Sequence, residues 1–154
     1  LRRLLEVPRA TAPGPGLAEA LQLLGSRPRR RGLTVVVSDL LAPQASWERP
    51  LRLLAARSEV VVVQVVDPRE LALPAAGVLA LVDPATGAHL TVRTTTAVRD
   101  RYAAAAADRA QAQRAAVRSA GADLVVLSTG SDWLPVLARA LAVRRRTRAV
   151  RRTS

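Results

Sequence analysis

Acidic residues follow two apolar segments of this chain, at the points where strands would end. Asp39 comes directly after the run Leu33 to Ser38, and Asp67 comes directly after the run Glu59 to Val66. The carboxyl ends of parallel strands meet at one edge of a sheet, and ligands of open α/β sheets gather there. The sequence therefore predicts that these two carboxylates share one rim.

Carboxylates at such a rim could serve two functions. One is the docking of a protein partner, contacted by Ser38, Asp39, Asp67 and Glu70. The other is a metal-dependent nuclease, because clustered carboxylates such as Asp39 and Asp67 can hold two metal ions for phosphoryl transfer. Each residue also has a structural interpretation, since Ser and Asp at strand ends bond loop amides and Asp-Pro opens turns. We favour the docking hypothesis and expect no enzyme.

The composition excludes several other kinds of site. The 154 residues contain no Cys and a single histidine, His89, which rules out disulfides and thiolate metal sites and leaves no Ser-His-Asp set. No apolar run reaches the roughly 18 residues that span a bilayer, and no signal peptide is visible. We expect a cytoplasmic protein, or one at the cytoplasmic face of the membrane if an upstream segment anchors it.

The formal net charge of +12 would by itself favour a polyanionic partner. All the basic residues are Arg, with clusters in residues 27–31 and 144–152, and this composition indicates genomic bias as well as selection. The aromatic residues are Trp47, Tyr102 and Trp133, too few for stacking on nucleic-acid bases. An Arg-rich nucleic-acid-binding domain therefore stays an alternative to the protein-interaction hypothesis.

Helical and extended segments alternate along the chain, which predicts an α/β fold with a mostly parallel sheet. We expect a three-layer doubly wound architecture with a β-hairpin inserted at a sheet edge. One domain is expected over residues 1–145, with an Arg-rich tail over residues 146–154. The expected elements are helices at 17–24, 46–57, 95–119 and 132–145, strands at 33–38, 60–66 and 123–127, and a hairpin at 78–92. The expected buried stripe of the long helix is Val98, Tyr102, Ala105, Ala106 and Val117.

Several motifs resemble the bacterial family called domain of unknown function 58. They are Ser38-Asp39-Leu40, Asp67-Pro68-Arg69-Glu70-Leu71-Ala72-Leu73-Pro74, Asp83, Thr86-Gly87, Arg101-Tyr102 and Leu127-Ser128-Thr129. The resemblance covers nearly the whole chain and matches the carboxyl-terminal portion of the family. It implies a von Willebrand factor A-like fold, Rossmann-like in topology, that lacks its first central strand. It also implies a non-enzymatic interaction domain that partners a MoxR-type AAA ATPase in assembly or maturation processes.

The same resemblance implies a metal-ion-dependent adhesion site in a complete domain, with Mg²⁺ held by oxygen ligands. Asp39 matches the third-loop ligand of such a site. The first-loop pattern Asp-x-Ser-x-Ser is absent from the chain, and Pro15 stands where relatives tend to have Thr. Because Pro supplies no side-chain oxygen, we expect this metal site to be incomplete or degenerate here.

The strand at residues 33–38 would then lack a neighbour on one side. Because the first central strand is expected to be missing, the apolar edge of this segment would be exposed. Exposed strand edges pair readily with other chains. We therefore expect self-association through the edge of strand 33–38, unless the full protein supplies the missing strand.

Overall fold

A computed structural model describes residue 14 and residues 16–26, 32–82 and 87–151, with residues 145–151 described as backbone only. Pro15, the Arg cluster at 27–31 and the turn at 83–86 lie outside the described residues. The same is true of residues 1–13 and of residues 152–154 in the expected tail. Among the described residues, no helix combines the length and the apolar composition needed to cross a bilayer.

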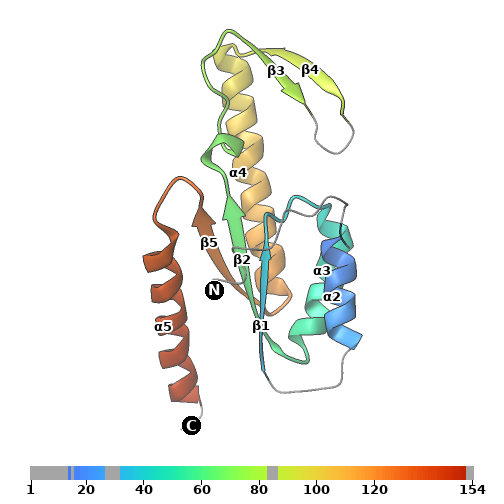
Figure 1. The fold of residues 1–154 in the computed structure, drawn as a ribbon, viewed down its shortest axis with the longest axis vertical. Helices are drawn as coiled ribbons and strands as arrows, with labels where there is room; N and C mark the ends of the chain where they lie inside the picture. The colour runs from blue at the N-terminus through green and yellow to red at the C-terminus, as the bar shows by residue number, and fades with distance from the viewer. Residues whose placement is uncertain (1–13, 15, 27–31, 83–86, 152–154) are drawn as a thin grey trace.

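Three parallel strands form the central sheet, in the order β1-β2-β5 (Figure 1). They are β1 (Leu33–Ser38), β2 (Glu59–Val66) and β5 (Asp123–Ser128). The central strand β2 is the most apolar, because both of its faces are covered and four consecutive valines on it are buried. This arrangement confirms the expected α/β class with an open, Rossmann-like parallel sheet.

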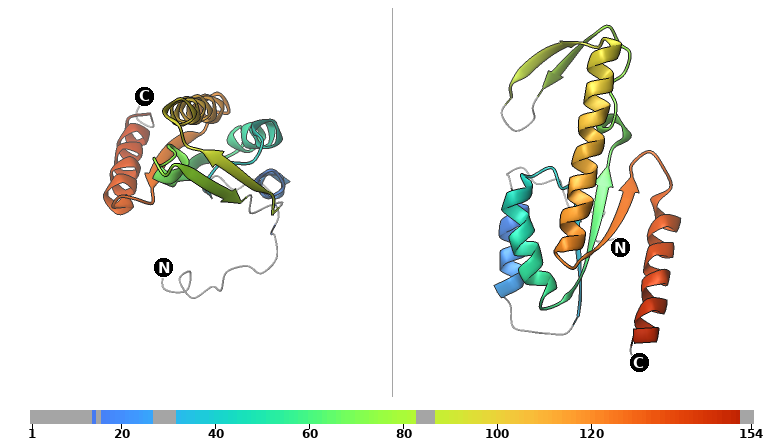
Figure 2. Two further views of the ribbon diagram at one scale, coloured as in Figure 1. Left: turned by 90° about the horizontal axis from the view of Figure 1, so that it is seen from above. Right: turned by 180° about the vertical axis from the view of Figure 1, so that it is seen from behind.

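Helices cover both faces of the sheet (Figures 1 and 2). The helices α2 (Leu17–Ser26), α3 (Gln44–Ala55) and α4 (Thr96–Ser119) lie on one face, and α5 (Trp133–Arg151) lies on the other. Residues 146–151, within the expected tail, therefore continue the last helix. The two faces have separate cores, because neighbouring strand residues point to opposite sides.

The larger core lies between the sheet and the helices α2, α3 and α4. Trp47 of α3 is completely buried there, and its indole Nε1 donates a hydrogen bond to the Ala42 carbonyl oxygen at 3.1 Å. Trp47 is thus a core residue in the first turn of α3. The smaller core contains Val61, Val63 and Leu127, which pack against Leu137 of α5.

The long helix α4 begins and ends as its sequence indicates. The Thr95 hydroxyl caps its first turn by accepting a hydrogen bond from the Val98 amide at 3.3 Å. After the helix ends, Gly121 adopts a φ of +81°, which favours glycine. The expected buried stripe is only partly right: Ala106 is buried, but Ala105 is exposed. On an Ala-rich helix the small side chains do not distinguish the buried face from the exposed one.

The β-hairpin forms as expected but in a different place. β3 (Val78–Val82) and β4 (His89–Arg93) pair antiparallel as a separate two-stranded sheet, so their expected position at an edge of the main sheet is wrong. The hairpin lies at the amino-terminal end of α4 (Figures 1 and 2). Thr94, directly after β4, bonds to Gly77, directly before β3. The Thr94 amide and hydroxyl both donate to the Gly77 carbonyl oxygen, at 2.8 and 3.2 Å. These bonds tie the hairpin to the start of α4.

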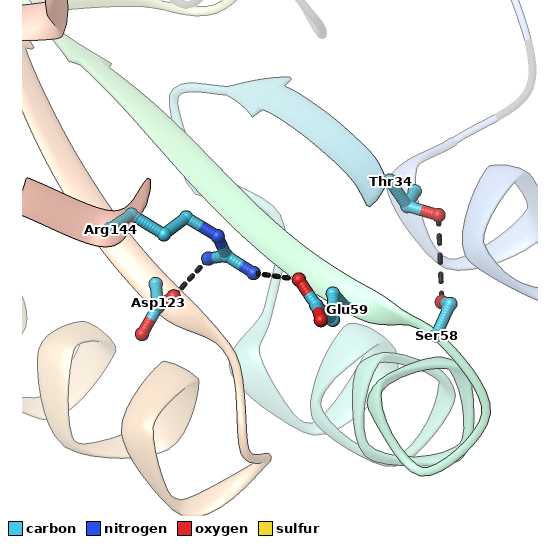
Figure 3. A network of polar contacts seen from close by, with 5 residues as sticks. All are labelled: Thr34, Ser58, Glu59, Asp123 and Arg144. Carbon is cyan, nitrogen blue, oxygen red and sulfur yellow. Dashed lines mark hydrogen bonds and ion pairs between the residues drawn. The ribbon is translucent and has the colours of Figure 1, made fainter. Parts of the chain in front are cut away.

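At the amino edge of the sheet, α5 is fastened by one arginine (Figure 3). The Arg144 guanidinium forms ion pairs with Glu59, at 3.0 Å, and with Asp123. These two carboxylates begin the adjacent strands β2 and β5, so a single cation bridges both strands to α5.

Candidate functional site

The loop after β1 is organised by its own side chains. The Ser38 hydroxyl accepts a hydrogen bond from the Leu40 amide, and the Asp39 carboxylate accepts one from the Leu41 amide, each at 3.0 Å. Ser38 and Asp39 therefore do what the structural interpretation expects of residues at a strand end. These bonds bend the chain sharply at the carboxyl edge of the sheet.

Leu40, at the centre of this bend, has a φ of +58°, the left-handed region. A residue with a side chain is disfavoured there by about 1–2 kcal/mol, yet Leu40 is almost completely buried. The burial of its side chain offsets the backbone strain, since a fully buried leucine contributes about 1.5–3 kcal/mol. The packing of Leu40 in the core thus stabilises the conformation of the loop.

A buried pair of glutamines fixes the backbone of the same loop. The Gln113 side-chain amide of α4 donates to the Leu40 carbonyl oxygen at 2.7 Å. The Gln64 amide of β2 donates to the Gln113 side-chain oxygen at 2.9 Å, and to the Asp39 carbonyl oxygen at 3.4 Å. Both glutamines are buried. We call these contacts the glutamine relay, which connects α4, β2 and the loop after β1.

The glutamine relay was only half visible in the sequence. Gln64 stands out as the one polar residue within the run Val60 to Val66. Gln113 gave no such signal, because it lies among other polar residues of α4 and its partners are 49 and 73 residues away in the chain. A buried polar residue in an apolar strand was the available indication that a distant partner exists.

The turn after β2 forms the second part of the rim. The Asp67 carboxylate accepts a hydrogen bond from the Arg69 amide at 2.9 Å and caps the 3-10 turn η1 (Pro68–Glu70). The Glu70 carbonyl oxygen accepts a hydrogen bond from the Tyr102 hydroxyl of α4 at 3.1 Å. The turn also lies close to the loop after β5, where a Cβ on Gly130 would lie 3.0 Å from Pro68 Cγ. The turn thus contacts both α4 and the loop after β5.

A small cleft of about 90 Å³ opens between these loops and α4. Its charged lining residues are Asp39, Glu70, Arg109 and Arg114. The structure therefore brings Asp39 and Glu70 together at one cleft. Ser38 and Asp67 follow the same strands at the same edge, but they do not line this cleft, and their side chains bond the loop backbones. We call this cleft the rim cleft.

The rim cleft does not fit a magnesium ion. Magnesium requires near-octahedral coordination by oxygen ligands, whereas the cleft supplies two carboxylates beside two arginines. In the part of the chain that the structure describes, no three His, Cys, Asp or Glu residues gather as a possible metal site. Pro15, at the expected threonine position, lies outside the described residues.

Comparison with known proteins identifies the family. The sequence model of the family described as "Protein of unknown function DUF58" matches residues 1–113. The chain belongs to the DUF58 family. Its relatives include uncharacterized proteins of Mycobacterium tuberculosis and Mycobacterium bovis, each 43% identical over 148 residues. An uncharacterized protein of Mycobacterium avium is 41% identical over the same length.

The extent of these matches differs between relatives. The matched region covers 95% of this DUF58 chain but 46% of the M. tuberculosis and M. bovis proteins, so the chain spans about half of their length. It covers 86% of the M. avium protein. No solved structure matches the chain.

Proposed function

We propose that this DUF58 chain is a non-enzymatic protein-interaction domain that binds its partner at the rim cleft. Asp39 and Glu70 contact the partner, while Ser38 and Asp67 shape the two loops that present them. The partner class is a MoxR-type AAA ATPase, which the family resemblance implies, and the context is assembly or maturation of other proteins.

The observation that carries this proposal is the glutamine relay. A loop whose backbone is bonded to two buried side chains changes little on binding, so little conformational entropy is lost when a partner docks. Asp39 lies in this loop, and its own carbonyl oxygen accepts the weaker of the Gln64 bonds. The acidic group is therefore presented in a preorganised position.

The charges of the rim cleft indicate the partner's complementary surface. Asp39 and Glu70 would pair with a Lys or Arg of the partner, and Arg109 and Arg114 would pair with flanking acidic residues. Such an arrangement of both signs fixes the orientation of the partner, and it discriminates against partners whose charges would face charges of the same sign. We therefore expect a contact whose association rate decreases as salt increases.

The test is the affinity of a purified, nucleotide-free MoxR-type AAA ATPase for the immobilised chain. Asp39→Asn keeps an oxygen for the Leu41 amide but removes the charge, and Glu70→Gln is the matching change across the cleft. Asp100→Asn, on an exposed position of α4, is the matched control. We expect each rim variant to weaken binding about tenfold or more, and the control to bind like the wild type.

Two results would contradict the proposal. One is unchanged affinity in both rim variants, which would place any docking site elsewhere. The other is magnesium-dependent cleavage of DNA or RNA that is lost in Asp39→Asn, since this is the outcome that the nuclease alternative requires. Binding that persists in the presence of EDTA supports docking without a metal ion.

A further inference from the structure

The hairpin formed by β3 and β4 is an incomplete sheet. Among the described residues, neither strand pairs with a third strand, and their only extensive packing is on each other. Figures 1 and 2 show the hairpin beyond the central sheet, at the amino-terminal end of α4. A two-stranded hairpin on its own is at best marginally stable in water, whereas three or more strands with an apolar face are stable. A further strand would therefore stabilise this part of the fold.

The sequence of β3 is typical of a covered strand. All five of its residues are apolar, in the order Val-Leu-Ala-Leu-Val, and continuous apolar runs are found in strands that are buried on both faces. Val78 and Val82 are nevertheless 59% and 55% exposed. The strand also has no proline and no charged residue, which normally protect an exposed strand edge from pairing with another chain. The free edge of β3 is thus unprotected.

The register of the hairpin shows which backbone groups lie on this edge. The Thr94 amide donates to the Gly77 carbonyl oxygen, and these two residues continue the register of the β3–β4 pairing. Hydrogen-bonded and non-hydrogen-bonded pairs alternate along an antiparallel ladder. Val78, Ala80 and Val82 therefore belong to non-hydrogen-bonded pairs, so their backbone amides and carbonyl oxygens point away from β4.

The opposite edge of the hairpin differs in composition. By the same alternation, the backbone groups of His89, Thr91 and Arg93 point outward from β4. Each of these residues is polar or charged, and a charged side chain on an edge strand disfavours pairing with another chain. A further strand is therefore expected at the β3 edge.

We propose that the added strand is β3 of a second copy of the chain. The observation that selects this occupant is the sequence of β3, which reads the same in both directions from Ala80. In a two-fold dimer the same surface of each copy contacts the other, so two β3 strands pair antiparallel. With Ala80 on the axis, Val78 of one copy lies opposite Val82 of the other, and leucine lies opposite leucine. Such cross-strand apolar pairs stabilise a sheet.

The backbone groups of the two edges are complementary in this register. The Ala80 amide of each copy donates to the Ala80 carbonyl oxygen of the other, and the Val82 amide donates to the Val78 carbonyl oxygen. The Val78 amide needs no partner across the axis, because it donates to the Ala76 carbonyl oxygen at 2.9 Å. Each copy thus donates two hydrogen bonds, and the two hairpins become one antiparallel sheet.

The combined sheet also has the apolar face that its stability requires. Leu79 and Leu81 lie opposite Val92 and Leu90 of β4, and residues that are opposite each other share one face of a sheet. Across the two-fold axis the leucines of the two copies are neighbours on this same face. The dimer therefore extends one apolar face over both hairpins, which neither hairpin has alone.

Cysteine cross-linking of the full chain tests the partner. The chain contains no Cys, so Ala80→Cys introduces a single thiol. In the dimer the two thiols belong to directly opposite residues, whose Cα atoms are about 5.5 Å apart, within reach of a short bismaleimide. Thr91→Cys is the matched control, because Thr91 is opposite Ala80 within the hairpin but lies on the other edge. The buffer contains enough salt to screen the net charge of +12.

The same reagent tests the register. We expect Ala80→Cys to give a covalent dimer and Thr91→Cys to stay monomeric. A mixture of Val78→Cys and Val82→Cys should cross-link faster than either variant alone, since like positions are four residues, about 14 Å, apart along the strands. Equal cross-linking of Ala80→Cys and Thr91→Cys, or no preference for the mixed pair, would overturn the inference.

Proline substitutions test the intermolecular hydrogen bonds. Ala80→Pro removes an amide that points away from β4, so the hairpin keeps its own ladder, and Thr91→Pro makes the equivalent change on the other edge. Circular dichroism verifies that both variants are folded. In sedimentation analysis over a wide range of concentration, we expect a dimer for the wild type and for Thr91→Pro. Ala80→Pro should raise the dissociation constant about tenfold or more, because each copy loses a hydrogen bond.

Two sedimentation results would also overturn the inference. One is a wild type that stays monomeric at every concentration, and the other is a dimer that Ala80→Pro does not weaken. No hairpin residue lines the rim cleft, so none of these results bears on the proposed docking function.

Discussion

Gln113 of α4 bonds the backbone of Leu40, with 2.7 Å between its side-chain nitrogen and the Leu40 carbonyl oxygen. These residues are 73 positions apart in the chain. The bond joins the longest helix to the one described non-glycine residue that has a positive φ. Through it, the position of Asp39 at the rim depends on the packing of α4 against the sheet.

Replacing Gln113 tests this relationship. Gln113→Ala leaves the Leu40 carbonyl oxygen and the Gln64 amide without this buried partner, and an unsatisfied buried polar group costs about 1–3 kcal/mol. We expect urea unfolding to show a loss of that size. Gln111→Ala, at an exposed position of the same helix, is the control and should change the free energy of unfolding by less than about 0.5 kcal/mol.

The two glutamines should also be energetically coupled. In a double-mutant cycle with Gln64→Ala and Gln113→Ala, residues that share a hydrogen bond show an interaction free energy of about 0.5–3 kcal/mol. Additive effects of the two substitutions would show that the glutamine relay contributes nothing as a unit.

The two tryptophans should behave oppositely. Trp47 is completely buried, so Trp47→Ala should destabilise the domain by about 3–5 kcal/mol through the cavity that it leaves. Trp133 is half exposed at the start of α5, and Trp133→Ala should cost about 1 kcal/mol or less. Thermal or urea unfolding at low protein concentration measures both. Equal losses would contradict the placement of these side chains.

Replacing two glycines by alanine should change the stability of the domain in opposite directions. Gly121 has a φ of +81°, so Gly121→Ala strains the backbone and should destabilise the domain by about 1 kcal/mol. Gly25 lies within α2, and no atom lies within 4 Å of the position that a Cβ would take, so Gly25→Ala should stabilise the helix by up to about 1 kcal/mol. Melting temperatures reveal the signs, and a stabilising Gly121→Ala would refute the turn conformation.

The ion pairs of Arg144 should reduce local opening of α5 but should contribute little to the free energy of unfolding of the whole domain. Its partners Glu59 and Asp123 are partly exposed, so Arg144→Ala should cost about 1 kcal/mol or less. Hydrogen exchange of the α5 amides should become faster in this variant. Arg139→Ala, at an exposed position of the same helix, serves as the control, and equal exchange in both variants would show that the ion pairs do not fasten α5.

Local sequence signals were sufficient for the sheet and its helices. The apolar β-branched runs of β1 and β2 and the helical spacing of α3 predict their own conformation, because each element buries the residues that define it. The hairpin strands were also predicted. Their position was not, since nothing in a local pattern reveals that Thr94 closes the hairpin on Gly77.

Only the site residues that follow strands could be predicted from the sequence. Asp39 was expected at the carboxyl edge because it follows a buried strand, and the structure places it there. Asp39 and Glu70 line the same cleft because the turn η1 brings Glu70 there, and the Asp67 carboxylate caps this turn. The contacts of Gln113 and Arg144 join residues many positions apart, and hydrophobic periodicity carries no information about them.

The most direct test of the docking account is hydrogen exchange of the chain with and without a bound MoxR-type AAA ATPase. The account predicts slower amide exchange at residues 38–41 and 67–71, the two loop segments that contribute Asp39, Leu41, Glu70 and Leu71 to the rim cleft. It also predicts unchanged exchange in the hairpin at residues 78–82 and 89–93. Protection of the hairpin with no change at the rim would contradict it.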